Sequence, residues 1–121
     1  MILVDTSVWI EFLRRSPPRA DLREALDAGE VLTHPFVIGE LALGLLGRRR
    51  AGILADLRLL PGLRVLRDAE VLDLVEVQAL AGKGIGWVDA HLLASALLGK
   101  VGLWTLDARL ARVAASLGAA A

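Results

Sequence analysis

Short apolar runs that alternate with longer helix-like segments are the feature that most constrains the fold of this chain. Strands are predicted at 2–4, 31–33, 64–66 and 102–105. Helices are predicted at 7–13, 21–28, 35–46, 50–60, 68–81, 87–98 and 108–117. Strands joined by helices form a parallel sheet with helices on both faces. The sequence therefore predicts an α/β fold, and 121 residues without a linker predict a single domain over 1–121.

Proline and glycine residues mark several of these boundaries. Ser16-Pro17-Pro18 is predicted to stop the first helix, and Pro35 occupies a favourable first position in the third helix. Gly82-Lys83-Gly84-Ile85-Gly86 fits neither the dinucleotide-binding fingerprint nor the P-loop, whose lysine is followed by serine or threonine. We interpret this segment as a loop that lets Trp87 and Asp89 approach a functional site.

The composition is apolar but does not predict a membrane protein. Hydrophobic residues make up 55% of the chain, yet the longest run without a charged residue is 90–99. These ten residues are half of the roughly 20 that a membrane-spanning helix needs. No basic leader precedes Asp5, and the absence of cysteine excludes disulfides and thiolate metal sites. We expect a soluble cytoplasmic protein whose apolar excess is partly covered by a partner.

The charge balance neither requires nor excludes a nucleic-acid substrate. The formal net charge is zero, whereas a simple electrostatic nucleic-acid binder is basic. Twelve of the 14 basic residues are arginines, which cluster at 14–15, 19, 23 and 48–50. If four of the 14 acids bind a metal ion, the remaining charges are 14 basic and ten acidic. A nucleic-acid substrate is then compatible with the charge, with arginines in contact with its phosphates. For any single arginine, a solvated helix end is the more frequent role.

Four acidic residues stand in apolar stretches of the sequence, where the surrounding residues predict burial. They are Asp5, Glu40, Asp89 and Asp107. Acids are rarely buried unless they are paired or bind a cation, and the two lysines, Lys83 and Lys100, lie in glycine-flanked loops. A hard divalent cation prefers such oxygen ligands, so the four acids predict a metal site.

Each of these acids also has a structural alternative. Asp5 could support the strand-to-helix turn, and Glu40 could be a protonated or hydrogen-bonded core acid. Asp89 and Asp107 could each cap a helix. If the acids serve a metal site, Asp5→Asn or Asp89→Asn should remove activity and stabilise the metal-free protein, because like charges repel. If they make structural hydrogen bonds, the same substitutions should destabilise the fold.

Four motifs, in order, resemble one known family. They are Leu3-Val4-Asp5-Thr6-Ser7-Val8-Trp9-Ile10, Ile38-Gly39-Glu40-Leu41, Asp89-Ala90-His91-Leu92-Leu93-Ala94 and Leu103-Trp104-Thr105-Leu106-Asp107. Over its whole length the chain resembles the PIN-domain ribonucleases, most closely the VapC-type toxins of toxin–antitoxin pairs. The resemblance implies a three-layer α/β/α domain with a mainly parallel sheet of four to five strands. It also implies metal-dependent cleavage of RNA, inhibition by a cognate antitoxin that inserts near the acidic pocket, and a homodimer.

The resemblance also implies roles for individual residues. Asp5, Asp89 and Asp107 are expected to bind Mg²⁺ or Mn²⁺ directly or through water, and Glu40 to bind the metal or orient the attacking water. Ser7 and Thr105 are expected to position carboxylates or waters through their hydroxyl groups.

Two features depart from this pattern or are left out of the site. The tail at 114–121 is poor strand material, so a fifth strand is expected to be missing or reduced. His91 is left out of the site because a histidine early in a helix more often packs or faces solvent.

The main rival is a non-catalytic α/β module that binds a protein partner. Side chains from two predicted helices could line a groove for a partner helix: Trp9, Phe12, Ile53, Leu54, Leu57 and Leu60. A core role is commoner for such residues, and a toxin would need both a groove and an acidic pocket. A haloacid-dehalogenase-like phosphatase is disfavoured because Ser7 stands where its second acid is required.

Overall fold

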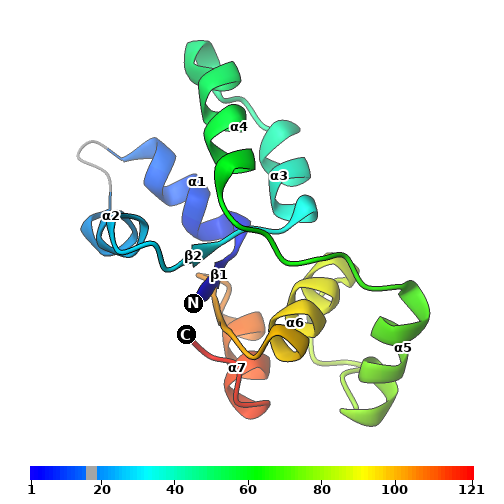
Figure 1. The fold of residues 1–121 in the computed structure, drawn as a ribbon. Helices are drawn as coiled ribbons and strands as arrows, with labels where there is room; N and C mark the ends of the chain where they lie inside the picture. The colour runs from blue at the N-terminus through cyan, green and yellow to red at the C-terminus, as the bar shows by residue number, and fades with distance from the viewer. Residues whose placement is uncertain (16–18) are drawn as a thin grey trace.

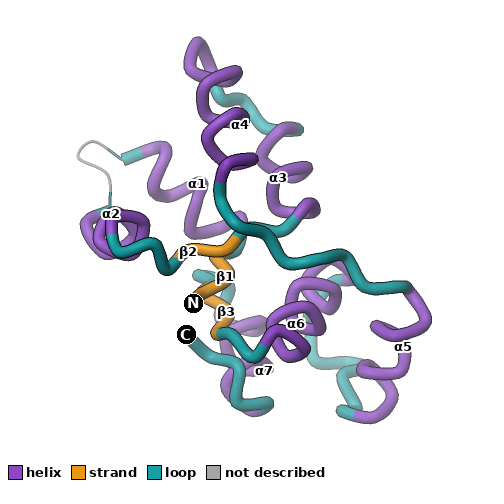
Figure 2. Tube along the Cα trace, in the orientation of Figure 1, coloured by secondary structure: helices purple, strands orange, loops and turns teal. Residues whose placement is uncertain are grey.

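A short parallel sheet lies at the centre of the molecule (Figures 1 and 2). The computed structural model describes residues 1–15 and 19–121, so the predicted helix stop at 16–18 lies outside them. The sheet has the strand order β2-β1-β3, formed by Val31–Leu32, Ile2–Val4 and Gly102–Trp104. Both neighbours of β1 run parallel to it. The carboxyl ends of β1 and β3 therefore meet at one edge of the sheet.

Helices cover the sheet from two sides (Figure 1). One group consists of α1 (Thr6–Arg14), α2 (Ala20–Asp27), α3 (Pro35–Ala42) and α4 (Arg50–Leu59), with a 3₁₀ turn at Gly47–Arg49 before α4. The other group consists of α5 (Asp68–Val77), α6 (Trp87–Gly99) and α7 (Ala108–Ser116). The predicted α/β fold with helices on both faces is confirmed.

The sheet is smaller than predicted. In the part of the chain that the structure describes, three strands replace the expected four to five. The predicted strand at 64–66 is absent because its backbone bonds elsewhere: the Arg64 carbonyl accepts a hydrogen bond from the Ser95 hydroxyl at 3.0 Å. Only Gly62 pairs nearby, in a single bridge to Thr33.

The C-terminal tail forms a remnant of a fifth strand. Ala120 makes one parallel bridge to Leu103, and the Leu103 N–H donates to the Ala119 carbonyl at 2.7 Å. The alanine- and glycine-rich tail thus reaches the sheet edge but does not extend the pairing, in agreement with its low strand propensity.

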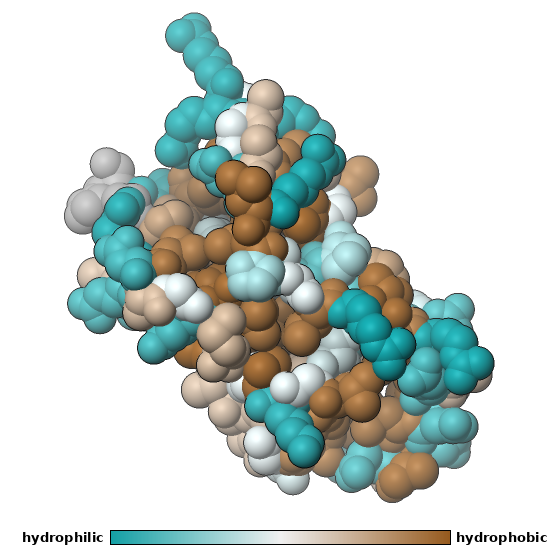
Figure 3. Space-filling model, in the orientation of Figure 1, coloured by the Kyte–Doolittle hydropathy of each residue, from teal (hydrophilic) through white to brown (hydrophobic). Residues whose placement is uncertain are grey.

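The third helix is shorter than the predicted 35–46. Leu43 is its C-cap, and Gly44 turns the chain by donating its N–H to the Leu41 carbonyl at 3.1 Å. Because α3 ends early, Leu43 and Leu45 are exposed. Figure 3 shows other apolar side chains at the surface, as expected for a chain with an apolar excess.

Helix α6 is the most deeply buried helix of the fold. Its residues from Ala90 to Ala96 are all buried, and Leu92 and Leu93 join Leu3 and Leu103 of the sheet in the main core. This packing explains the uncharged sequence and fixes the first turn of α6, which carries Asp89, relative to the sheet.

No described helix has both the length and the apolar character needed to cross a bilayer.

Candidate active site

Asp5 is the anchor of the candidate site. It follows β1 and is 6% exposed. Its Oδ1 accepts a hydrogen bond from the Thr6 N–H at 2.8 Å, which makes Asp5 itself the N-cap of α1. Asp5 rather than Thr6 or Ser7 is the cap, because Asp5 holds the extended backbone of a cap residue (φ −70°, ψ 157°).

Two hydroxyl groups hold the other oxygen of Asp5. The Ser7 and Thr105 hydroxyls donate to Asp5 Oδ2 at 2.8 and 2.7 Å. They also accept hydrogen bonds from the turn after β3, from Leu106 N–H to Ser7 and from Asp107 N–H to Thr105, both at 3.0 Å. The two strand ends are therefore tied together through Asp5. Ser7 and Thr105 lie beside a carboxylate, as expected, while their effect on activity stays a prediction.

Asp89 and Asp107 each cap a helix with one carboxylate oxygen. Asp107 Oδ1 accepts from the N–H groups of Arg109 and Leu110 at 2.9 and 3.0 Å. Asp89 Oδ2 accepts from the Gly86 N–H at 2.9 Å. The structural alternative is thus real for both residues. Among the described residues, no donor contacts the second oxygen of either carboxylate, so each retains an oxygen for a ligand.

Asp89 lies within electrostatic reach of Asp5 and Asp107. Burial raises the pKa of the half-buried Asp89, and the negative charges of Asp5 and Asp107 raise it further, against the opposing effect of the Gly86 N–H. Asp5, Asp89 and Asp107 come from the ends of β1, α6 and β3, so separate segments converge on this region. A cation there would stabilise the ionised form of Asp89.

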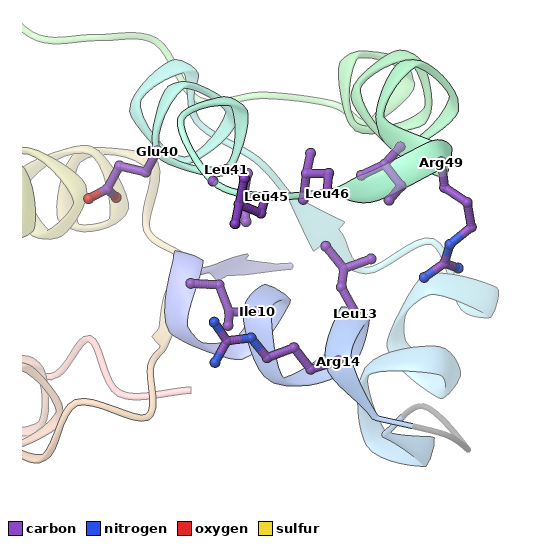
Figure 4. Close-up of a pocket in the computed structure, with 10 residues that line it drawn as sticks. Ile10, Leu13, Arg14, Glu40, Leu41, Leu45, Leu46 and Arg49 are labelled. Atoms are coloured by element: carbon purple, nitrogen blue, oxygen red, sulfur yellow. The ribbon is translucent and has the colours of Figure 1, made fainter.

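Glu40 lies at the margin of this region and is exposed. Its Oε1 accepts a hydrogen bond from the Thr6 hydroxyl at 2.8 Å, and its carboxylate points away from Leu45 and Leu46 (Figure 4). The expectation of a buried Glu40 was wrong because Val37 and Leu41 form the buried face of α3. Thr6 was missed as a partner, although its position next to Asp5 at the strand-to-helix turn was a usable signal.

Asp107 is exposed as well, so Asp5 is the one fully buried acid of the four. The apolar residues around Asp107 in the sequence belong to β3 and to the buried side of α7, whereas Asp107 stands in the turn between them.

Two comparisons with known proteins bear on this arrangement. A profile of the PIN domain family matches residues 2–116. The chain is 49% identical over 123 residues to Ribonuclease VapC32 of Mycobacterium tuberculosis, from both strain CDC 1551 / Oshkosh and strain ATCC 25618 / H37Rv. The alignment covers 99% of this chain and 95% of each relative. The chain belongs to the PIN-domain family. The resemblance to VapC-type PIN proteins inferred from the four motifs is confirmed.

The donors present in this PIN domain suit a hydrated divalent cation. In the described residues, no three His, Cys, Asp or Glu side chains are close enough together to hold a metal ion directly. The donors are nevertheless carboxylate oxygens with free positions, and Mg²⁺ usually retains several waters and binds only one or two carboxylates. Coordination shared between one or two of these carboxylates and water therefore suits the donors present.

His91 packs inside this PIN domain rather than facing the acids. It is buried, its Nε2 lies 3.2 Å from Asp68 Oδ1, and its ring packs in T-shaped pairs with the rings of Phe36 and Trp87. The expected packing role is confirmed. Burial, with a smaller contribution from His91, lowers the pKa of the neighbouring His34 to about 4.

Proposed function

We propose that this PIN domain is a metal-dependent endoribonuclease that hydrolyses RNA phosphodiester bonds and acts as the toxin of a toxin–antitoxin pair. The observation that carries the proposal is the convergence of Asp5, Asp89 and Asp107 at the carboxyl edge of the sheet. That edge is where parallel α/β sheets place their chemistry. The 49% identity to proteins named ribonucleases supports the same activity.

In this proposal Asp5, Asp89 and Asp107 hold Mg²⁺ or Mn²⁺, partly through water, with Glu40 as a further ligand or as the group that orients the attacking water. The ion, when bound, lowers the pKa of coordinated water and offsets the negative charge on the phosphate in the transition state. Mg²⁺ is the expected choice because carboxylates, waters and phosphate oxygens are its usual ligands.

The side chains of the chain supply positioning and proton transfer. Ser7 and Thr105 fix the Asp5 carboxylate, so this group needs little reorganisation when charge develops nearby. Thr6 holds Glu40 by Oε1 and leaves Oε2 free of protein donors in the described residues. Glu40 Oε2 can therefore accept the proton of an attacking water that enters from the exposed side.

A groove beside Glu40 suits the antitoxin. It runs between α1, α3 and α4, and apolar side chains line most of it, including Ile10, Leu13 and Leu41 (Figure 4). Because Glu40 lines the same groove, a segment bound there would reach the acidic region. We propose this groove as the place where the cognate antitoxin inserts. The homodimer stays a prediction.

The rival proposal of a non-catalytic binding module has weaker support. A second groove is lined by Trp9, Phe12, Ile53, Leu57 and Leu60, most of the predicted set. Trp9 and Leu57 are buried in the main core, however, and the others pack against it. Core packing therefore explains why these positions are apolar. A groove for a protein partner is also compatible with an acidic active site, so it does not argue against the ribonuclease proposal.

Cleavage of a mixed RNA pool by the purified protein tests the proposal. Cleavage is expected with Mg²⁺ or Mn²⁺ and should be lost with a chelator and in Asp5→Asn. No cleavage with either ion, together with no metal-induced rise in melting temperature, would favour the binding module. Metal binding without cleavage would retain the acidic site and point to a different nucleic-acid substrate.

A further inference from the structure

A basic groove lies on α7. Helix α7 is on the side of the sheet away from α4 (Figure 1). The cations of this groove come from two segments: Lys83 lies in the loop before α6, and Arg109 and Arg112 lie on α7. Among the residues that the structure describes, none of those lining this groove is acidic. Arg109 and Arg112 are three residues apart and so lie on the same face of α7, about 4.5 Å apart along the helix axis.

These three cations are free of internal partners. Within residues 1–15 and 19–121, neither an ion pair nor a side-chain hydrogen bond involves Lys83, Arg109 or Arg112, and all three are exposed. Arginine presents a planar set of donors that matches phosphate, and lysine adds a mobile positive charge. The groove is therefore available for an anionic chain.

Several arginines in the clusters visible from sequence are already engaged. Arg15 pairs with Glu11, and Arg19 pairs with Asp21 and lies over the Trp104 ring. Arg23 lies over the Phe12 ring, and Arg50 donates to the backbone carbonyls of Ala42 and Gly44 at the C-terminal end of α3. These contacts stabilise the fold and leave those groups less available to a ligand than the cations of the α7 groove.

The groove begins at the rim of the acidic site. The Arg109 N–H donates to Asp107 Oδ1, and the Arg109 side chain lies directly on Gly84. Gly84 has a φ of +82°, a backbone conformation that favours glycine, and a Cβ there would come within 2.7 Å of Arg109 Cδ, so the Arg109 side chain would have to shift. Gly84 belongs to the same loop as Gly86, which holds Asp89. Arg109 thus links the acidic site to the groove.

We propose that Lys83, Arg109 and Arg112 form a subsite for the phosphate backbone of single-stranded RNA next to the scissile bond. This inference rests on the proposed ribonuclease function and assigns the glycine-rich loop 82–86 a role in substrate binding. Consecutive phosphates of a strand that leaves the acidic site meet Arg109 first and then Arg112, and Lys83 lines the same groove. The subsite adds affinity for any sequence and carries no sequence preference.

Single substitutions at Arg112 and Lys83 test the subsite, with Arg58→Ala as the matched control. Arg58 is also exposed and outside every ion pair of the described residues, but it lies on α4, across the sheet. Arg109 stays unchanged because its side chain packs on the loop that holds Asp89. The probe is a 20-nucleotide single-stranded RNA of randomised sequence, bound in chelator and cleaved with Mg²⁺.

Arg112→Ala and Lys83→Ala should each weaken RNA binding by about 3- to 10-fold. Each should also reduce the slope of log affinity against log salt by about 0.7, the value for one lost single-strand phosphate contact. In cleavage assays KM should rise while kcat at saturating RNA stays unchanged. Arg58→Ala should match the unmodified protein in every measurement.

The outcomes separate this inference from the proposed function. If the unmodified protein cleaves RNA and both groove variants behave like Arg58→Ala, the phosphate subsite is wrong and the ribonuclease proposal stands. A fall in kcat with no change in KM or salt slope also overturns the subsite, because the side chains would then act on the chemical step or on the loop. If the unmodified protein neither binds nor cleaves RNA, the ribonuclease proposal fails and the subsite fails with it.

Discussion

The two halves of the acidic region are built differently. On the sheet side, Asp5 is buried and accepts hydrogen bonds from one N–H and two hydroxyl groups. On the helix side, Glu40 is exposed and accepts one hydrogen bond, from Thr6. The sheet half is fixed by strand ends that the core holds in place, whereas the helix half depends on one surface contact. Stability and activity should therefore respond separately to substitutions in the two halves.

Asp5→Asn should have the largest effect, because it disrupts both the ligand set and the hydrogen-bond network. We expect RNA cleavage to fall by more than about 1,000-fold. The sequence alone led us to expect that Asp5→Asn would stabilise the metal-free protein. The three hydrogen bonds that Asp5 accepts reverse this expectation: the free energy of unfolding should fall by about 1–2 kcal/mol, since an amide offers only one acceptor oxygen to three donors. Rates on an RNA pool and chemical denaturation measure the two quantities. A more stable Asp5→Asn would show that charge repulsion outweighs these hydrogen bonds.

Glu40→Gln should separate activity from stability. We expect cleavage to fall by about 10- to 100-fold through loss of the proton acceptor, and the free energy of unfolding to change by less than about 0.5 kcal/mol because Glu40 is exposed. Thr6→Val should reproduce a smaller part of the loss in rate. If Glu40→Gln destabilises the protein as much as Asp5→Asn does, the proposed contrast between the halves is wrong.

Asp89→Asn should stabilise the metal-free protein while lowering its activity. Because the pKa of Asp89 is raised in the folded state, its ionised form opposes folding, and this penalty appears as pH rises past the ordinary value of 3.8. The side chain is half-buried and partly screened, so we expect a gain of about 0.5 kcal/mol at pH 7. Asparagine retains an oxygen for the Gly86 N–H. Melting curves in chelator test this, and a lower melting temperature than that of the parent would contradict it.

His34 provides a pH-dependent test of how the helix half is anchored. His34 caps α3, the helix that carries Glu40, and is fully buried. Since burial lowers its pKa from 6.5 to about 4, its contribution to stability is complete above pH 6.5 and is lost as pH falls toward 4. This loss in the free energy of unfolding amounts to about 1–3 kcal/mol. His34→Asn retains an acceptor for the helix cap and should remove most of this loss. Chemical denaturation of the parent and the variant at pH 7, 5.5 and 4 measures this loss. If both proteins lose the same free energy of unfolding at low pH, His34 is not its source.

The contrast between the halves also shows what the sequence could predict. Asp5 and Asp107 follow predicted strands, and the carboxyl ends of parallel strands share an edge, so their placement at one edge was predictable. That β1 and β3 are direct neighbours comes from the structure. Ser7 and Thr105 were expected from the family resemblance, and both contact Asp5. The exposure of Glu40 was not, because α3 is apolar nearly all round and its pattern does not reveal which side faces the core.

Long-range contacts and the number of strands also could not be predicted from the sequence. The Thr6–Glu40 hydrogen bond joins residues 34 positions apart and depends on how α1 packs against α3. The segment at 64–66 has strand-like residues but bonds to a side chain of α6 in place of a neighbouring strand. Likewise, arginine clusters in the sequence did not identify the free cations, because pairing with nearby acids, rings and carbonyls is a property of the folded chain.

The Thr105–Asp5 hydrogen bond spans 100 residues, and this span has a consequence for biosynthesis. Proteins are made from the N-terminus, so Asp5 leaves the ribosome long before α6 and β3 exist. Until those segments emerge, the first strand lacks the partner that positions its acid, and Asp89 and Asp107 are missing. A nascent chain therefore has no assembled acidic site, and under the proposed function the ribosome that makes this protein is not exposed to cleavage of its own RNA by an unfinished copy.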